Sequence, residues 1–268
     1  MLSDGQVAQF QRDGFLLGGR ALRAETVDLL NEEVARVIRD RDSGGRQPVL
    51  CHNFSRAQGQ TVWQIVNIWE ASNAFHDIIA NPTVVNEVAQ LTGASELRIW
   101  HDQIQYKPAT DGGVNMWHQD SPYWPILVPK TAQVTAWVAL DDVDEENGCM
   151  SMVEGSYHWG PNIEFLHTLK EWDAMPSEFD GHPLKVRTCP VPKGHVHFHH
   201  ALTWHGSPAN RSSRPRRAIA LHYMTQETRY AAEGSHVMKQ FVTVEDGDIL
   251  QGEHFPLVWS KTPVAVDG

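Results

Sequence analysis

Trp117-His118-Gln119-Asp120 is the most informative stretch of the sequence when it is taken with Trp204-His205-Gly206-Ser207 and Arg216. Side chains alternate across an extended strand, so His118 and Asp120 are expected to point to the same side and to share one metal ion. A distant histidine, His205, would complete two imidazoles and one carboxylate on one face of that ion. This set leaves positions open and suits Fe(II) that binds a co-substrate and oxygen together.

Arg216 follows His205 at the start of the next predicted strand. Its planar guanidinium matches a carboxylate through two parallel hydrogen bonds, so Arg216 is a natural partner for a carboxylate co-substrate. A lone His-x-Asp pair is a weak signal, whereas all four residues in this order form a specific one. The alternative interpretation is a hydrogen-bonded pair of His118 and Asp120 near a turn, with Arg216 as a solvated charge.

Further motifs stand in a fixed order around these residues. They are Tyr106-Lys107-Pro108, Trp117–Asp120, Val134–Leu140, Glu146–Cys149, Gly155–Gly160 and the run from His205 to Arg216. From Asp102 to Tyr223 the chain thereby resembles the phytanoyl-CoA dioxygenase family of Fe(II)/2-oxoglutarate-dependent oxygenases. The N-terminal Phe10–Phe15 also resembles the family's opening helix and turn.

The resemblance implies a set of roles and cofactors. It makes His118, Asp120 and His205 the iron ligands and Arg216 the partner of the distal carboxylate of 2-oxoglutarate. The implied cofactors are Fe(II), 2-oxoglutarate and O2, and the implied reaction is hydroxylation of an unactivated carbon in a small-molecule metabolite, with succinate and CO2 as co-products. The co-substrate contacts that the family would place here are Ser207, Trp137 and, as a further candidate, Gln103.

The chain departs from the family pattern at one point. Two alternative functions also compete with the main hypothesis. It reads Glu154-Gly155-Ser156-Tyr157 where the family usually has Pro-Gly-Ser-His. Halogenating relatives replace the carboxylate ligand, so the presence of Asp120 disfavours halogenation. One rival is a non-catalytic jelly-roll binding module or metal sensor. Another is a cupin-like enzyme that uses a different metal without 2-oxoglutarate, which Arg216 disfavours.

Length and composition narrow the class of protein. The 268 residues fit one domain, and 41% hydrophobic residues suffice for a sizeable core. A net charge of −11 argues against a nucleic-acid partner and against an anionic membrane. No apolar run approaches the roughly 20 residues that span a bilayer. The first residues lack a signal-peptide pattern, and the cysteines (Cys51, Cys149 and Cys189) lack a Cys-x-x-Cys motif, which is typical of a cytoplasmic protein with reduced thiols. The oligomeric state is not indicated.

Periodicity predicts a mainly β protein with flanking helices. Helical patterns lie near Ser3–Phe10, within 24–40 and at Pro82–Leu91, where Asn81 and Gly93 mark the two ends. The predicted strands are Leu97–Lys107, Val134–Leu140, Leu184–Pro190, His195–Phe198 and Arg217–Tyr223. This order predicts a double-stranded β-helix (jelly roll, cupin-like) in a single domain over residues 1–268. The N-terminal residues 1–93 would be helical, 94–225 would form the jelly-roll core, and 226–268 would be a C-terminal segment.

Three other clusters have alternative interpretations. His195, His197, His199 and His200 favour a strand of partly exposed imidazoles beside the site over a second metal site. The acidic run from Asp141 to Glu146 lacks the spacing of a calcium loop and is expected to be a solvated turn. Arginines at 211, 214 and 217 are expected to be ordinary loop charges, although a phosphate or coenzyme A group could bind them. Candidate substrate residues are Tyr123, Trp124 and Trp69.

Overall fold

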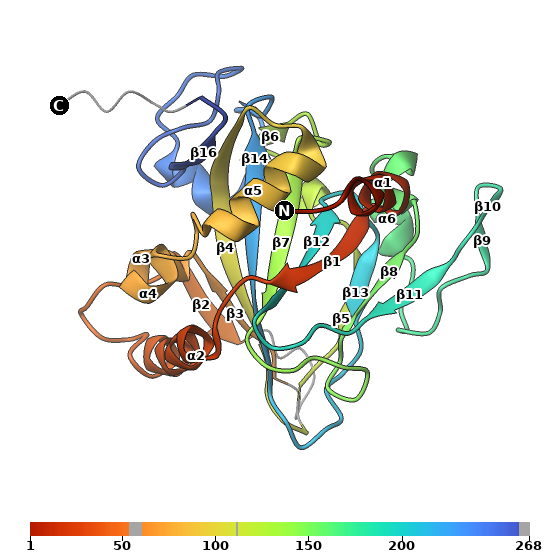
Figure 1. Cartoon of the computed structure of the whole chain (residues 1–268), viewed down its shortest axis with the longest axis horizontal. Coiled ribbons are helices and arrows are strands. Elements are labelled where there is room, and N and C mark those ends of the chain that lie inside the picture. Colours follow the sequence, from red (N-terminus) through yellow and green to blue (C-terminus); the bar gives the residue numbers. More distant parts are fainter. Residues whose placement is uncertain (54–60, 111, 263–268) are drawn as a thin grey trace.

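The computed structural model describes residues 1–53, 61–110 and 112–262, so the predicted C-terminal segment is described only as far as 262. The centre of the molecule is a large antiparallel sheet with strand order β1-β12-β7-β14-β4-β3-β2, and β16 pairs with β4 (Figure 1). Its strands are β1 (Phe15–Arg20), β2 (Leu50–Asn53), β3 (Trp63–Val66), β4 (Glu96–Lys107), β7 (Gln133–Ala139), β12 (His195–His200), β14 (Arg216–Thr225) and β16 (Leu257–Ser260).

A smaller antiparallel sheet has the order β11-β8-β13-β5. Its strands are β5 (Asn115–His118), β8 (Met150–Val153), β11 (Val186–Cys189) and β13 (His205–Ser207). Two short ribbons complete the β structure: β6 (Leu127–Val128) with β15 (Arg229–Tyr230), and β9 (Glu178–Phe179) with β10 (His182–Pro183). The two main sheets form a jelly roll, which confirms the predicted fold class.

The three predicted helices are present as α1 (Asp4–Asp13), α2 (Ala24–Arg39) and α5 (Pro82–Thr92). The side chain of Ser3 accepts a hydrogen bond from the Gln6 backbone, and that of Asn81 accepts from Thr83 and Val84, so both expected N-caps are confirmed. The short helical elements are α3 (Ile68–Ala71), α4 (Asn73–His76), α6 (Ile163–Leu166) and the 3-10 turns η1 (Ser121–Tyr123), η2 (Ser156–Trp159) and η3 (Val237–Phe241).

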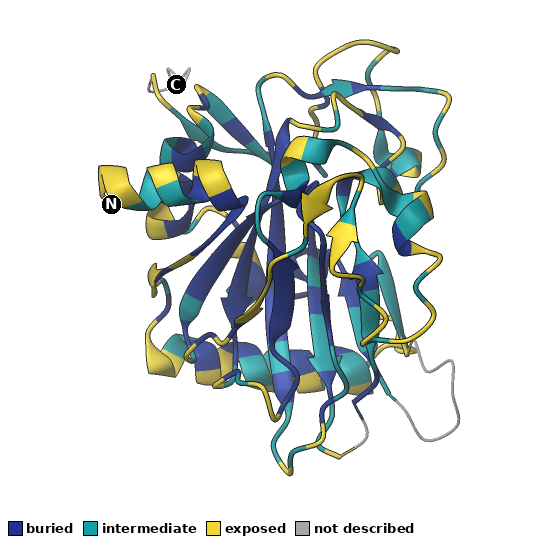
Figure 2. Cartoon of the chain, turned by 90° about the vertical axis from the view of Figure 1, so that its right-hand side faces the viewer, coloured by how far each residue is buried: buried dark blue, intermediate teal, exposed yellow. Residues whose placement is uncertain are grey.

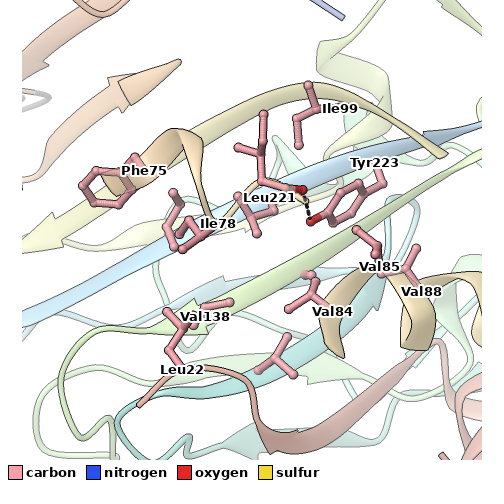
Figure 3. Packing of buried hydrophobic residues seen from close by; sticks show 14 of the residues in the cluster. Leu22, Phe75, Ile78, Val84, Val85, Val88, Ile99, Val138, Leu221 and Tyr223 are labelled. Atoms are coloured by element: carbon pink, nitrogen blue, oxygen red, sulfur yellow. Dashed lines mark hydrogen bonds between the residues drawn. The ribbon is translucent and has the colours of Figure 1, made fainter. Parts of the chain in front are cut away.

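The main core fills the space between these helices and one face of the large sheet. In Figure 3, Val84 and Val88 of α5 point toward Leu221 and Tyr223 of β14. The hydroxyl of Tyr223 donates to the Ile79 carbonyl at 2.9 Å, so the buried polar tip of this ring is satisfied. Figure 2 shows buried strands in the centre and exposed residues on the outer sides of the helices. None of the helices in the described part of the chain is long and apolar enough to cross a membrane.

A β-bulge in β4 decides which of its side chains face the site. His222 of β14 pairs with His101, but the next residue, Tyr223, pairs with Ile99, so Trp100 is an extra residue in β4. The alternation of β4 therefore shifts by one position at the bulge. Before it, Leu97 and Ile99 face the helices; after it, Ile104 does so. The side chains of β4 that line the cavity described below follow the bulge, at His101, Gln103 and Gln105.

Candidate functional site

The two predicted histidines and the aspartate meet at one edge of the small sheet. β13 pairs with β5 so that His205 lies directly opposite His118. Oδ1 of Asp120 is 3.8 Å from Nε2 of His118 and 3.6 Å from Nε2 of His205. One potential ligand atom from each residue lies within 4.8 Å of the other two. The structure thus places the three side chains as a facial ligand set for one metal ion.

The backbone reaches this arrangement differently from the sequence-based expectation. β5 ends at His118, and Asp120 has helical dihedrals (φ −72°, ψ −52°) because it opens the η1 turn. The expectation of one extended segment through both residues was therefore wrong. A turn, rather than strand alternation, brings the Asp120 carboxylate beside the two imidazoles.

The backbone fixes the tautomers of both histidines. Nδ1 of His118 is 2.7 Å from the Met116 carbonyl, and Nδ1 of His205 is 2.9 Å from the Thr203 carbonyl. A carbonyl oxygen can only accept, so each Nδ1 carries the proton and donates. Each Nε2 consequently keeps a lone pair that faces the Asp120 carboxylate and is available to a metal.

The aspartate is held through its other oxygen. Oδ2 of Asp120 accepts hydrogen bonds from Oγ1 of Thr135 at 3.0 Å and from Nε2 of His199 at 3.1 Å. Thr135 in turn lies 2.8 Å from Nδ1 of His222. The sequence indicated no role for Thr135 or His222 and only a place beside the site for His199, although all three lie on predicted strands or on strand residues next to them. These contacts leave Oδ1 free to bind a metal.

Burial sets the protonation of the site. It lowers the pKa of His118 to about 4 and that of His205 to about 4; the His205 imidazole further disfavours a charge on His118, and the His199 imidazole disfavours one on His205. Burial alone would raise the pKa of Asp120, but His205 and the hydrogen bond from His199 outweigh it and hold the pKa well below its usual range. At neutral pH the site therefore holds neutral imidazoles and a carboxylate, the forms that bind metal ions.

A buried cation lies behind the wall of the site. Arg216 is fully buried; its Nε and one terminal nitrogen donate to the Gly148 carbonyl, and the same terminal nitrogen donates to Oγ of Ser207 at 2.9 Å. The indole of Trp137 lies 5.3 Å from the guanidinium carbon. Burial lowers the pKa of Arg216 to about 10, so it stays protonated at neutral pH.

The second terminal nitrogen of Arg216 is buried and has no hydrogen-bond partner in the described part of the chain. A buried cation without a facing carboxylate is costly unless a ligand supplies one. Arg216, Ser207 and Trp137 therefore fit a carboxylate co-substrate beside the metal. Arg217, its neighbour, points the other way and pairs with Asp141 at 2.7 Å.

Lys107, which the sequence did not single out as a site residue, supports the same corner. It pairs directly across the strands with Arg216 and is fully buried. Its Nζ donates to the carbonyl and hydroxyl oxygens of Ser207 and to the carbonyl of Pro208. Burial and the nearby Arg216 hold the pKa of Lys107 well below its usual value.

A cavity of about 1130 Å³ opens onto these residues. The sequence-predicted residues that line it are His118, Asp120, His205, Ser207, Trp137, Gln103, Tyr123 and Trp124. Arg216 is one side chain away, behind Ser207 and Trp137. Trp69 was wrongly expected here: it packs in the main core, and its backbone N–H donates to Asp102.

The other predicted clusters have structural roles. His197, His199 and His200 are buried, so the expectation of partly exposed imidazoles was wrong for them, and of these three only His199 lines the cavity. The acidic run and the arginine cluster pair with each other: Arg214 forms an ion pair with Asp144, and Arg217 forms one with Asp141. These two arginines are therefore already neutralised and are poorly placed to bind a phosphate.

The comparisons with known proteins agree with this geometry. A family model, Phytanoyl-CoA dioxygenase (PhyH), matches residues 10–218. The chain belongs to the phytanoyl-CoA dioxygenase family. It is therefore an enzyme of the Fe(II)/2-oxoglutarate-dependent dioxygenases, with the ligand set of His118, Asp120 and His205 intact.

Relatives of this phytanoyl-CoA dioxygenase family member act on different compounds. It is 27% identical over 240 residues to the ectoine dioxygenase of Bordetella parapertussis, covering 84% of this chain and 76% of that protein. It is 26% identical over 245 residues to the peroxisomal phytanoyl-CoA dioxygenase of Rattus norvegicus, covering 86% and 70%.

Among solved structures, the family member is similar to the alpha-ketoglutarate-dependent carbocyclase SnoK from nogalamycin biosynthesis, with a TM-score of 0.76 and 26% identity over 96% of this chain and 97% of that one. The epimerase SnoN, solved with Fe3+, alpha-ketoglutarate and nogalamycin RO, shares the fold with a TM-score of 0.73, 24% identity, and coverage of 96% and 98%.

Proposed function

We propose that this enzyme hydroxylates an unactivated carbon of a small-molecule metabolite, with succinate and CO2 as co-products. The observation that carries the proposal is the pairing of an intact ligand set with a buried, partly unpartnered guanidinium beside it. A metal site alone would fit many reactions. The nearby cation favours one that uses a dicarboxylate co-substrate.

In this proposal His118 and His205 bind iron through Nε2 and Asp120 binds it through Oδ1. When bound, iron and 2-oxoglutarate supply the oxidant that removes hydrogen from a C–H bond of the substrate. The chain's contribution is to hold the ligands before the metal arrives. The Met116 and Thr203 carbonyls orient the imidazoles, while Thr135 and His199 orient the carboxylate.

The distal carboxylate of 2-oxoglutarate is assigned to Arg216 and Ser207. Oγ of Ser207 accepts hydrogen bonds from both Lys107 and Arg216, so its own proton is left to donate to the co-substrate. Trp137 covers the guanidinium and lines the same wall. Gln103 is separated from Trp137 by Ala220 in the sheet and is assigned to the outer side of the co-substrate.

Tyr123 and Trp124 are assigned to the substrate side of the cavity. They follow Asp120 directly in the η1 turn and its end, so they stand next to the metal ligands. The hydroxyl of Tyr123 is 2.7 Å from Nε2 of His167, which ties the turn to the segment after α6. These rings would limit access of water to the reacting atoms.

The test is conversion of 2-oxoglutarate to succinate in the presence of Fe(II) and ascorbate. Wild-type protein should release succinate and, under nitrogen, show the absorption band of iron-bound 2-oxoglutarate. Asp120→Ala should do neither, whereas the exposed Asp173→Ala variant should behave as wild type. A wild-type protein that forms no band and no succinate would instead be a binding module that lacks turnover.

A further inference from the structure

The part of the cavity that lies beyond the metal ligands has a distinct chemical character. Its floor is the face of β4 and β3 that follows the bulge, where the lining residues include Gln103, Gln105 and Gln64. On the central strand β14, Ala220 lies between Trp137 and Gln103 in the same row of the sheet. This small side chain leaves room above the sheet, and the amides stand around the hollow.

The amides are already oriented. Nε2 of Gln64 donates to Oε1 of Gln103 at 2.7 Å, and Nδ2 of Asn115 donates to Oε1 of Gln105 at 3.4 Å. The carboxamide oxygens of Gln103 and Gln105 thus each accept one hydrogen bond, and their amide nitrogens remain to donate to a ligand. Oδ1 of Asn115 is buried and has no partner in the described residues.

Another part of the cavity lining is aromatic. The Trp124 indole lies edge-on to the His222 ring, with centroids 4.8 Å apart, and the His101 and His236 rings are stacked at 5.8 Å. Burial lowers the pKa of His222 to about 4 and that of His236 to about 4. These rings are therefore uncharged at neutral pH and present flat surfaces with polar edges.

Charge is almost absent from the lining. Among its described residues, only Asp120 and Lys170 carry a fixed charge, and Asp120 is assigned to iron. Nζ of Lys170 donates to the His167 carbonyl. A substrate with an ammonium group would find no free carboxylate here, and burying an unpaired charge is strongly unfavourable.

We infer that the substrate is an uncharged, oxygen-rich cyclic compound, such as a hydroxylated polycycle or its glycoside. Its hydroxyl and carbonyl groups bind the amide wall of Gln105, Gln64 and Asn115, and its ring lies against the aromatic wall. This inference rests on the proposed function and names its substrate class.

The test compares three probes on the protein loaded with Fe(II) and 2-oxoglutarate under nitrogen. They are a flavone O-glucoside that lacks a catechol, ectoine and phytanoyl-CoA. Isothermal titration calorimetry should give a dissociation constant for the glucoside at least tenfold lower than for the other two. Tighter binding of ectoine or phytanoyl-CoA, or no binding of the glucoside, would overturn the inference.

Matched variants locate the binding wall. Gln105→Leu should weaken the glucoside about five- to tenfold, because it removes a hydrogen bond to the ligand. The exposed Gln251→Leu variant should bind as wild type does. Equal affinity in all three proteins would place the compound elsewhere. Because 2-oxoglutarate conversion without substrate is measured separately, a failure of this inference leaves the proposed oxygenase activity testable by itself.

Discussion

Nζ of Lys107 lies 2.7 Å from Oγ of Ser207, and a guanidinium nitrogen of Arg216 lies 2.9 Å from the same oxygen. Two basic side chains that face each other across neighbouring strands normally destabilise a sheet when both are charged. Here both donate to one hydroxyl, so its two lone pairs are used and its proton points away from them. The proposed contact of Ser207 with 2-oxoglutarate depends on this shared oxygen.

Lys107→Met should therefore weaken 2-oxoglutarate binding while sparing the metal. The variant keeps the length of the side chain but removes one of the two donors that orient the Ser207 hydroxyl. A net hydrogen bond contributes about 0.5–1.5 kcal/mol, so the dissociation constant should rise roughly two- to tenfold. Titration of 2-oxoglutarate into the anaerobic iron protein measures it. Unchanged affinity, as expected for the exposed Lys185→Met variant, would show that Lys107 has only a structural role.

Arg216→Ala should reduce 2-oxoglutarate affinity more strongly. It removes the charged partner of the co-substrate carboxylate, and charge-assisted hydrogen bonds contribute about 1.5–3 kcal/mol each. The affinity should fall at least roughly tenfold, with iron content unchanged. Arg217→Ala is the control, since Arg217 pairs with Asp141 on the other side of the strand. If Arg217→Ala is the weaker binder of the two, the assignment of the anchor is wrong.

His205→Ala should abolish stoichiometric iron binding because it removes one of the three proposed ligands. His200→Ala should retain iron, since Nε2 of His200 is bonded to the Thr131 carbonyl, away from the triad. His199→Ala should also retain iron, although Oδ2 of Asp120 then loses one of its two donors. Metal analysis of the three purified variants decides this. Loss of iron from His199→Ala alone would add His199 to the ligand set.

Stability should fall steeply in mild acid. Burial lowers the pKa of His197 to about 3 and that of His200 to about 4, below the ordinary value of 6.5. Between pH 6.5 and about 4 the unfolded chain therefore binds more protons than the folded one, so the free energy of unfolding decreases as the pH falls. Each such histidine contributes a slope of about 1.4 kcal/mol per pH unit in that window.

Urea unfolding of the metal-free protein at several pH values measures this slope. His200→Gln should make it shallower by about one proton, because Nδ1 of His200 accepts from the Leu202 backbone and cannot be protonated without losing that bond. The exposed His76→Gln variant should keep the wild-type slope. A slope that is the same in wild type and His200→Gln would contradict the linkage.

Tyr223→Phe should destabilise the fold by about 1–2 kcal/mol. The variant keeps the ring in the core shown in Figure 3 but leaves the buried Ile79 carbonyl without this donor. The free energy of unfolding in urea measures the effect. Tyr106→Phe is the matched control, because the Tyr106 hydroxyl makes no hydrogen bond among the described residues. Equal stability of both variants would mean that water replaces the lost donor.

Much of the fold follows from local chemistry that the sequence displays. Ser3, Asn81 and Gly93 bound their helices as predicted, because capping and left-handed turns depend on residues close in sequence. The long strands β4, β7 and β14 were found for a similar reason, since alternation persists over many residues. The triad and Arg216 were recognised from their order along the chain, and the structure brings the triad together.

What the sequence did not reveal depends on contacts between distant segments. Simple alternation through Leu97–Lys107 would place Ile99 and Gln103 on one face, but the extra residue at Trp100 puts them on opposite faces. Lys107 can be buried because the backbone carbonyls of Ser207 and Pro208, far away in the sequence, accept hydrogen bonds from its Nζ. Trp69 could not be told from a cavity residue because a large aromatic side chain suits either place. The division of one domain into three successive regions stays a prediction, but its boundaries do not follow the sheets: β1, β2 and β3 from residues 1–93 and β16 from the C-terminal segment join the large sheet.

Because His118 pairs directly with His205, metal binding requires the correct register between β5 and β13. A slip of one residue between β5 and β13 would turn the His205 side chain to the other side of the small sheet. The ion would then lose a ligand although every residue was still present. Copies of the chain with a misregistered sheet would remain metal-free, so they could not generate an oxidant that damages the protein itself.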